Sequence, residues 1–223
     1  MGRMITLKCS DGVEIGAYRA DPAGAPRGAI VVVQEIFGVN KHIRDVADRY
    51  AAEGYLAIAP ALFDRLEKNV DIGYEGAERA HGMELVGKSP RELALRDIAA
   101  AVEVAKSAGK VGIVGFCWGG ALAWFSAAEM PGISAAVGYY GGGILGAKDL
   151  KPKVPIMLHF GEQDANIPAA GVREFAAARP DIPVYLYPAG HAFNRAADPH
   201  AYHAPSAELA LKRTLEFFAK NLG

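Results

Sequence analysis

Cysteine is scarce in this sequence, which has only Cys9 and Cys117 among its 223 residues. Two cysteines are too few for the disulfide framework that stabilises small secreted domains. The first residues, MGRMITLKCSDG, lack the apolar run of a signal peptide, so we expect none. Both observations favour a protein of the reducing cytoplasm.

An excess of charge of one sign is also absent. The chain has 24 Lys and Arg residues against 25 Asp and Glu residues, a formal net charge of −1, and no long block of like charges. This balance gives no basis for a nucleic-acid partner. Every apolar run ends well before the ~18 residues that a membrane-spanning helix needs, so no membrane association is expected.

The composition itself favours one globular domain over residues 1–223. Hydrophobic residues make up 51% of the chain, enough for a well-buried core at this length. No internal repeat, low-complexity segment or linker interrupts the chain. The sequence does not determine the oligomeric state, and a monomer is our default expectation.

Buried strands and amphipathic helices are predicted to alternate along most of the chain. Asp11-Gly12 is a common hairpin-turn pair, which indicates two N-terminal strands around it. Further strands are predicted at 28–33, 55–60, 111–116, 133–139, 154–160 and 183–188, and helices from the Asn40 cap to Gly54 and at 89–109, 118–129, 168–178 and 206–221. Such alternation is typical of an α/β fold with a mostly parallel sheet and helices on both faces.

Two of these helices carry more specific expectations. Ser89 and Glu92 form a capping-box pattern, with Pro90 in the first helical turn. The final helix is expected to bury Leu211, Leu215, Phe218 and Leu222. The segment 61–88 has a mixed pattern and is left without an assignment.

The stretch KVGIVGFCWGGALAW, residues 110–124, places Cys117 where a predicted strand meets a predicted helix. Open parallel sheets carry their binding sites beyond the carboxyl ends of the strands. A strand that turns at once into a helix strains the turn residue, and its neighbours two residues away must be small, as Gly115 and Gly119 are. This is the pattern of a nucleophile elbow with cysteine in place of serine. A buried structural cysteine is the alternative.

A thiolate nucleophile needs a base, and the base needs an acid that orients it. In elbow hydrolases the order along the chain is nucleophile, acid, histidine. Asp164 follows the strand in VPIMLHFGEQDANIP, and His191 follows the strand in VYLYPAGHAFNR. Both are therefore expected on the same rim as Cys117, and we predict that the three residues form a catalytic triad.

Other residues fit these roles less well. Glu162 lies two residues before Asp164 and is the second choice for the acid. Among the other histidines, His159 lies inside a predicted strand, and His42 and His81 precede Cys117 in the sequence. His200 and His203 lie in a later loop that does not follow directly from a strand end.

Acyl transfer also requires hydrogen-bond donors for the oxyanion. The backbone amide of Trp118 is one candidate, and the amide of Ile36 in the loop QEIFGVN is our choice for the second. A tight turn at Gly38 is the alternative reading of that loop. No Cys/His cluster has zinc spacing, and GGGILG lacks the helix start of a dinucleotide site, so we expect no metal and no organic cofactor.

Five segments together resemble the dienelactone hydrolase (carboxymethylenebutenolidase) family: QEIFGVN, GFCWGGALA, GYYGGG, FGEQDANIP and AGHAFNR. The resemblance extends over nearly the whole chain, from the SDG turn to RTLEFF. It implies an α/β-hydrolase fold with Cys117, His191 and Asp164 as the triad. It also implies a small-molecule partner, an unsaturated lactone that bears a carboxylate and arises in the degradation of aromatic compounds.

The resemblance implies further roles that the spacing alone does not identify. Glu35 is implied to lie against the thiol and to take its proton when substrate binds. Arg195, and by a weaker match Arg79, are implied to bind the substrate carboxylate, while Phe37 and Tyr140 line the pocket. Alternatively, Arg79 is a solvated residue on a helix, and Phe37 and Tyr140 are ordinary aromatic residues of the core.

Two departures from the family pattern leave the substrate open. The stretch from Asp64 to Ala77 has no clear match, and Trp118 is bulkier than the leucine associated with the family at that position. A broader hydrolase of small esters or thioesters is therefore an alternative. A non-catalytic protein of the same fold whose cysteine senses oxidants is another.

Overall fold

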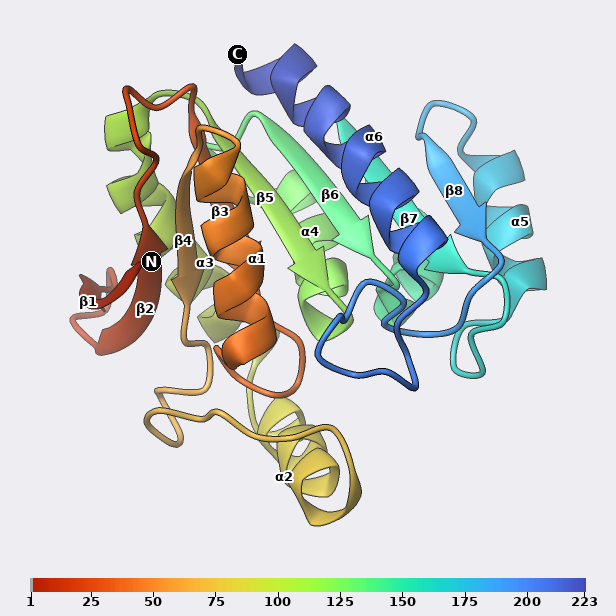
Figure 1. The fold of residues 1–223 in the computed structure, drawn as a ribbon, viewed down its shortest axis with the longest axis horizontal. Helices are drawn as coiled ribbons and strands as arrows, with labels where there is room; N and C mark the ends of the chain where they lie inside the picture. The colour runs from red at the N-terminus through yellow and green to blue at the C-terminus, as the bar shows by residue number, and fades with distance from the viewer. Residues whose placement is uncertain (1) are drawn as a thin grey trace.

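A single eight-stranded sheet forms the centre of the computed structural model, which describes residues 2–223 (Figure 1). The strand order is β1-β2-β4-β3-β5-β6-β7-β8, and only β2 runs antiparallel to its neighbours. The strands are β1 Arg3–Lys8, β2 Glu14–Ala20, β3 Ala29–Val33, β4 Leu56–Pro60, β5 Val111–Phe116, β6 Ala135–Tyr139, β7 Ile156–Gly161 and β8 Val184–Tyr187. This arrangement confirms the predicted mostly parallel sheet.

Helices cover both faces of the sheet, which is why every residue of β3 and β5 is buried. In Figure 1, α1 and α6 lie over one face while α3 and α4 lie over the other. The helices are α1 Lys41–Ala52, α2 Gly76–Gly87, α3 Arg91–Ala105, α4 Trp118–Glu129, α5 Ala169–Ala178 and α6 Ala204–Leu222, with short 3₁₀ turns at Lys106–Ala108 and Gly142–Ala147. None of the described helices is long and apolar enough to cross a membrane.

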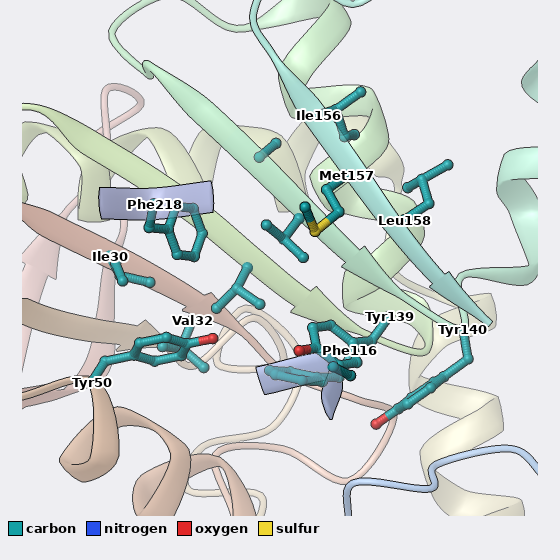
Figure 2. Close-up of a cluster of buried hydrophobic side chains, with 14 of the residues drawn as sticks. Ile30, Val32, Tyr50, Phe116, Tyr139, Tyr140, Ile156, Met157, Leu158 and Phe218 are labelled. Carbon is teal, nitrogen blue, oxygen red and sulfur yellow. The ribbon is translucent and has the colours of Figure 1, made fainter. Parts of the chain in front are cut away.

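The main core includes the side chains between the sheet and helices α1 and α6, together with residues of α4 and α5. Figure 2 shows Ile30 and Val32 of β3 with Phe116 of β5, and the ring of Phe218 reaching in from α6. The Phe218 ring packs edge-on against Tyr50 of α1, with ring centroids 6.2 Å apart. Full burial of a side chain such as Phe218 contributes about 1.5–3 kcal/mol, so this cluster fixes both helices on the sheet.

Two local predictions are wrong. Ser89 does not cap α3; its hydroxyl donates to the carbonyl of Leu85 at the end of α2, and the N-cap position is taken by Pro90. On α6, Leu211 and Leu215 are only partly buried. The buried stripe follows i, i+4 spacing instead, and small residues at its centre let α6 approach the sheet closely: Ser206, Ala210, Thr214, Phe218 and Leu222.

Helix α2 is a feature that the sequence analysis did not assign. It lies apart from the other helices, beyond the carboxyl ends of the parallel strands (Figure 1). A small cluster of Phe63, Val70 and Leu85 attaches it to the body. Gly82 allows this approach, because a Cβ there would lie 2.2 Å from the carbonyl oxygen of Ile36. Helix α2 therefore sits over the edge of the sheet where α/β proteins bind their ligands.

Candidate active site

Cys117 occupies the turn between β5 and α4, where its backbone has φ 53° and ψ −116°. The turn is tight enough to exclude side chains on both sides. A Cβ on Gly115 would lie 1.9 Å from the carbonyl oxygen of Gly119, and a Cβ on Gly119 would lie 2.4 Å from that of Val33. The predicted steric reason for the two glycines is therefore present, and the thiol is left partly exposed at the rim.

Backbone strain gathers around this turn. Cys117, Tyr140 (φ 38°) and Ala192 (φ 58°) all have the positive φ that residues other than glycine seldom adopt. All three line one cavity. Strain of this kind costs about 1–3 kcal/mol per residue and persists where the surrounding structure holds it, often at functional sites.

His191 and Asp164 meet on the same rim, as predicted from their places after β8 and β7. The Nδ1 atom of His191 lies 2.6 Å from Oδ2 of Asp164. The other oxygen, Oδ1, accepts hydrogen bonds from the backbone amides of Asn166 (2.8 Å) and Ile167 (3.2 Å). These amides fix the carboxylate, so the carboxylate in turn fixes the imidazole ring.

The charge of His191 is set by its neighbours. Burial alone would lower the pKa of His191, but the hydrogen bonds to Asp164 and to the Cys117 thiol outweigh it and raise the pKa to about 10. His191 is therefore an imidazolium at neutral pH in this arrangement.

Two backbone amides near Cys117 have no acceptor. Neither the N–H of Ile36 nor that of Trp118 donates a hydrogen bond to another group in the described part of the chain. Both residues line the cavity that contains Cys117. The Trp118 amide belongs to the first turn of α4, whose dipole adds to its attraction for an anion.

Glu35 has a different partner from the one that the resemblance implies. It is fully buried, and its two carboxylate oxygens accept hydrogen bonds from Nε (3.1 Å) and Nη2 (2.8 Å) of Arg195. No hydrogen bond joins it to Cys117 among residues 2–223; the thiol lies against His191 instead. Burial raises the pKa of Glu35, but the Arg195 guanidinium outweighs it and leaves the pKa below its ordinary value, so Glu35 is a carboxylate.

Arg195 is fully engaged within the protein. Besides Glu35 it donates from Nη1 to Asp198 at 3.0 Å, and its guanidinium carbon lies over the rings of Phe37 (5.0 Å) and Tyr74 (4.2 Å). Tyr74 was not predicted from the sequence as part of the site. Tyr74 lies in the stretch 64–77, where no motif could have indicated it.

Arg79 is the second arginine of the cavity, and it differs from Arg195 in its surroundings. It lies on α2, is exposed, and makes no ion pair or side-chain hydrogen bond with any residue that the structure describes. Its guanidinium is therefore available to a ligand in the cavity. Ile36, Phe37, Tyr140, Trp118 and His191 line the same cavity, which has a volume of about 630 Å³.

The remaining candidates lie elsewhere. His159 is buried between the hydroxyls of Tyr187 (2.8 Å) and Thr214 (3.1 Å), which agrees with its predicted place in the core. Glu162 forms an ion pair with Arg173, and His203 hydrogen-bonds Ser206 at the start of α6. No group of three or more His, Cys, Asp or Glu side chains within residues 2–223 is arranged to hold a metal ion.

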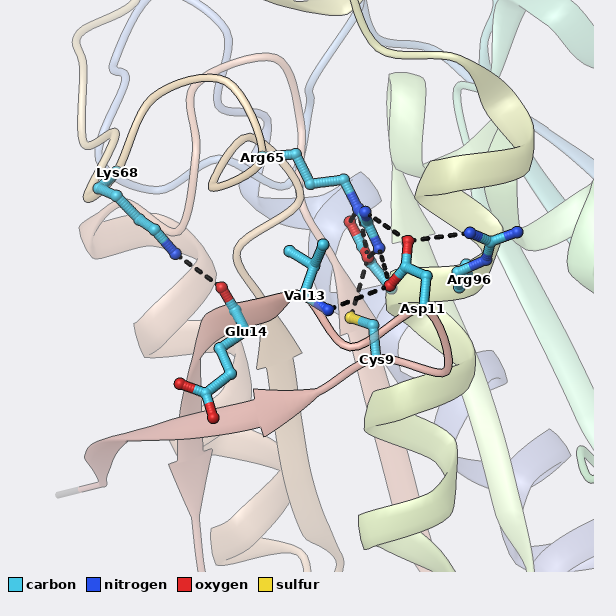
Figure 3. Close-up of polar contacts among 8 residues, drawn as sticks. Cys9, Asp11, Val13, Glu14, Arg65, Lys68 and Arg96 are labelled. Atoms are coloured by element: carbon cyan, nitrogen blue, oxygen red, sulfur yellow. Dashed lines mark hydrogen bonds and ion pairs between the residues drawn. The ribbon is translucent and has the colours of Figure 1, made fainter.

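The second cysteine has an environment opposite to that of Cys117. Cys9 is buried, and its thiol donates to Asp97 at 3.1 Å. Burial and the Asp97 carboxylate raise the pKa of Cys9 to about 12, so it stays a thiol. Figure 3 shows Cys9 next to Arg65 and Asp11. Arg65 bridges Asp11 and the Asp97 carboxylate that accepts from Cys9. Cys9 is thus a structural residue, and Cys117 is the cysteine that faces a cavity.

Comparisons with known proteins agree with this geometry. The model of the dienelactone hydrolase family matches residues 15–222. The carboxymethylenebutenolidase of Pseudomonas putida is 37% identical over 228 residues, which cover 96% of this chain and 95% of that protein. An Escherichia coli K12 protein, named as a candidate carboxymethylenebutenolidase, is 39% identical over 231 residues, covering 94% of this chain and 83% of its own.

Solved structures extend the comparison to the fold. The crystal structure of a candidate dienelactone hydrolase from Klebsiella pneumoniae has a TM-score of 0.84 and 35% identity, and covers 98% of this chain and 99% of its own. The Pyrococcus furiosus esterase Pf2001 shares the fold at 17% identity, with a TM-score of 0.73. The chain therefore belongs to the dienelactone hydrolase family, and it is a hydrolase with the α/β-hydrolase fold.

Proposed function

We propose that this hydrolase opens lactones or esters that bear a carboxylate, with Cys117 as nucleophile, His191 as base and Asp164 as the acid that orients it. The proposal rests on three side chains that lie together at one rim of the sheet. A strained cysteine lies at the start of α4, the His191 side chain lies against its thiol, and a buried carboxylate lies 2.6 Å from the imidazole Nδ1. This is the relation of nucleophile, base and orienting acid that acyl transfer requires.

The first half of the reaction forms a thioester. The Cys117 thiolate attacks the carbonyl carbon, and the carbonyl oxygen becomes an oxyanion that accepts hydrogen bonds from the amides of Ile36 and Trp118. The C–O bond to the leaving oxygen then breaks, and this oxygen takes a proton from His191. The ring is now open, and the acyl group is bound to sulfur.

The second half restores the enzyme. His191, now neutral, accepts a proton from a water molecule while the water oxygen attacks the thioester carbon. The C–S bond breaks and returns the thiolate, and the product leaves as a carboxylic acid. In this conformation the thiol lies against His191, while both oxygens of Glu35 are bonded to Arg195, so the proton that the thiol gives up resides on His191 and not on Glu35.

The carboxylate of the substrate is the part of the proposal that rests on the arginines. Arg79 has no partner among the described residues, so a carboxylate can bind it without breaking an existing ion pair. Arg195 lines the same cavity, but three of its nitrogens already bond to Glu35 and Asp198. We assign Arg79 as the main anchor and Arg195 as a residue that shapes and charges the pocket.

A matched pair of substrates tests this function. Arg79→Gln should lower kcat/KM on a carboxylate-bearing enol lactone by about 10–100-fold, since a charge-assisted hydrogen bond is worth ~1.5–3 kcal/mol. The same variant should change hydrolysis of the corresponding neutral methyl ester by less than about threefold. Equal losses on both substrates would contradict the anchor and favour a broader esterase. Absence of any turnover would favour a non-catalytic protein.

A further inference from the structure

Two helices present matching faces to the catalytic cavity. Helix α4 contributes Trp118, Ala121 and Phe125, which are spaced i, i+3, i+7 and therefore lie on one side of the helix. From Cys117 to Phe125 this face extends about 12 Å along α4, at ~1.5 Å per residue. The cavity thus continues well beyond the nucleophile as an apolar arm.

Helix α2 lines the cavity with a similarly spaced face. Arg79, Met83 and Val86 are spaced i, i+4, i+7, so one charged and two apolar side chains share one side of α2. Met83 is 53% exposed although it is large and apolar. Val86 packs against the same small cluster as Trp118 of α4, which places the apolar ends of the two faces together.

The arm is larger than a small lactone requires. A lactone ring with one carboxylate side chain has about ten non-hydrogen atoms; even at the ~30 Å³ that a water molecule occupies in the liquid, these fill at most about 300 Å³. The cavity volume is about 630 Å³. About half of the space therefore remains, and the part beside α2 and α4 is lined by apolar side chains.

We propose that the substrates of this enzyme are amphipathic, with an anionic group at Arg79 and an apolar group of about six to ten carbons in the arm formed by Met83, Val86, Trp118, Ala121 and Phe125. The proposal rests on the function assigned above and names its substrate class. The observations that carry it are the unpaired guanidinium and the apolar side chains on one face of α2.

Ligand binding tests the arm without any turnover. Cys117→Ala protein is titrated with sodium butyrate and sodium octanoate by calorimetry. Each buried methylene strengthens binding about fourfold, so octanoate should bind at least tenfold more tightly than butyrate. Val86→Trp, which fills the arm, should abolish this difference. Ala77→Trp is the matched control, since Ala77 is exposed and lies about 180° around α2 from Val86.

Turnover of p-nitrophenyl esters in the enzyme with an intact thiol then separates this proposal from the proposed function. In one series the acyl group is lengthened from acetyl to octanoyl, and kcat/KM of the parent enzyme should rise at least tenfold. The Val86→Trp variant should not show this rise, whereas Ala77→Trp should. Equal binding of butyrate and octanoate, or equal effects of the two tryptophan variants, would overturn the arm even if acetate ester is hydrolysed. Tighter octanoate binding without hydrolysis of any ester would support the arm and refute the hydrolytic function instead.

Discussion

The ion pair between Glu35 and Arg195 should dominate the effect of any substitution at Arg195. The Glu35 side chain is fully buried and that of Arg195 is 7% exposed, so neither charge can be hydrated if its partner is removed. Breaking a buried pair in this way costs about 3–5 kcal/mol. Arg195→Met should therefore lower the free energy of unfolding by about that amount, a large part of the ~5–15 kcal/mol typical of a domain. Glu35→Gln should cost less, because Arg195 keeps Asp198 as a partner.

A double-mutant cycle measures the interaction directly. The double variant Glu35→Gln/Arg195→Met removes both charges, so it should be more stable than the sum of the two single losses predicts, by at least ~1.5 kcal/mol. Urea unfolding followed by tryptophan fluorescence gives all four free energies. The reasoning would be refuted if the two single losses added to within ~0.5 kcal/mol of the double variant's loss, or if Arg195→Met were as stable as the parent. Arg195 would then be free to bind the substrate.

Three further predictions follow from single sites. Burial lowers the pKa of His159 to about 3 from 6.5, so between these pH values the unfolded chain binds a proton that the folded chain does not, and stability falls as pH falls. At ~1.36 kcal/mol per pKa unit this loss of stability is about 3 kcal/mol between pH 7 and pH 4. Urea titrations should show that the His159→Gln variant lacks this loss, and the same pH dependence in the variant and the parent would contradict the prediction. Gly119→Ala places a Cβ 2.4 Å from the Val33 carbonyl oxygen, so it should displace the elbow and lower kcat at least about 100-fold by steady-state assay; near-normal kcat would argue against a rigid turn. Asp164→Asn should lower kcat by up to about 10⁴-fold, as for other triad acids, whereas a loss below tenfold would mean that Asp164 does not orient His191.

The elbow could be predicted from the sequence because its determinants are local. The apolar run VGIVGF is typical of a covered strand, and the spacing of Gly115 and Gly119 around Cys117 fits the steric demand of a tight strand-to-helix turn. The observed bounds of β5 and α4 match the predicted ones at both ends. The loop positions of Asp164 and His191 follow from the strands before them in the same way. The fold and the geometry of these three residues were therefore accessible from spacing alone.

Helix α2 could not be predicted because tertiary contacts, not local pattern, determine it. Its sequence GAERAHGMELVG contains three glycines, and its large apolar residues cluster at one end instead of recurring with helical spacing. The cluster with Phe63 and Val70 holds it in place. The same reason explains the missed pocket residues Met83 and Val86, which become functional candidates only when α2 faces α4.

The pairing of Glu35 with Arg195 lies outside what sequence can give. The two residues are 160 positions apart, and each was assigned to the site by resemblance. Nothing in either local sequence indicates that one will satisfy the hydrogen bonds of the other. Only the structure shows that Glu35 and Arg195 pair with each other. The resemblance implied instead that Glu35 contacts the Cys117 thiol and that Arg195 binds the substrate carboxylate.

Covalent labelling by substrate tests most directly whether Cys117 is the nucleophile. The enzyme is mixed with p-nitrophenyl acetate, quenched in acid within the first turnover, and examined by intact-protein and peptide mass spectrometry. The proposed mechanism predicts a stoichiometric burst of p-nitrophenol and one acetyl group on the peptide that contains Cys117, with the adduct persisting in His191→Ala protein and absent from Cys117→Ala. Cys9→Ala should label and turn over like the parent. An acetyl group on any other residue, or full turnover by Cys117→Ala, would contradict the assignment.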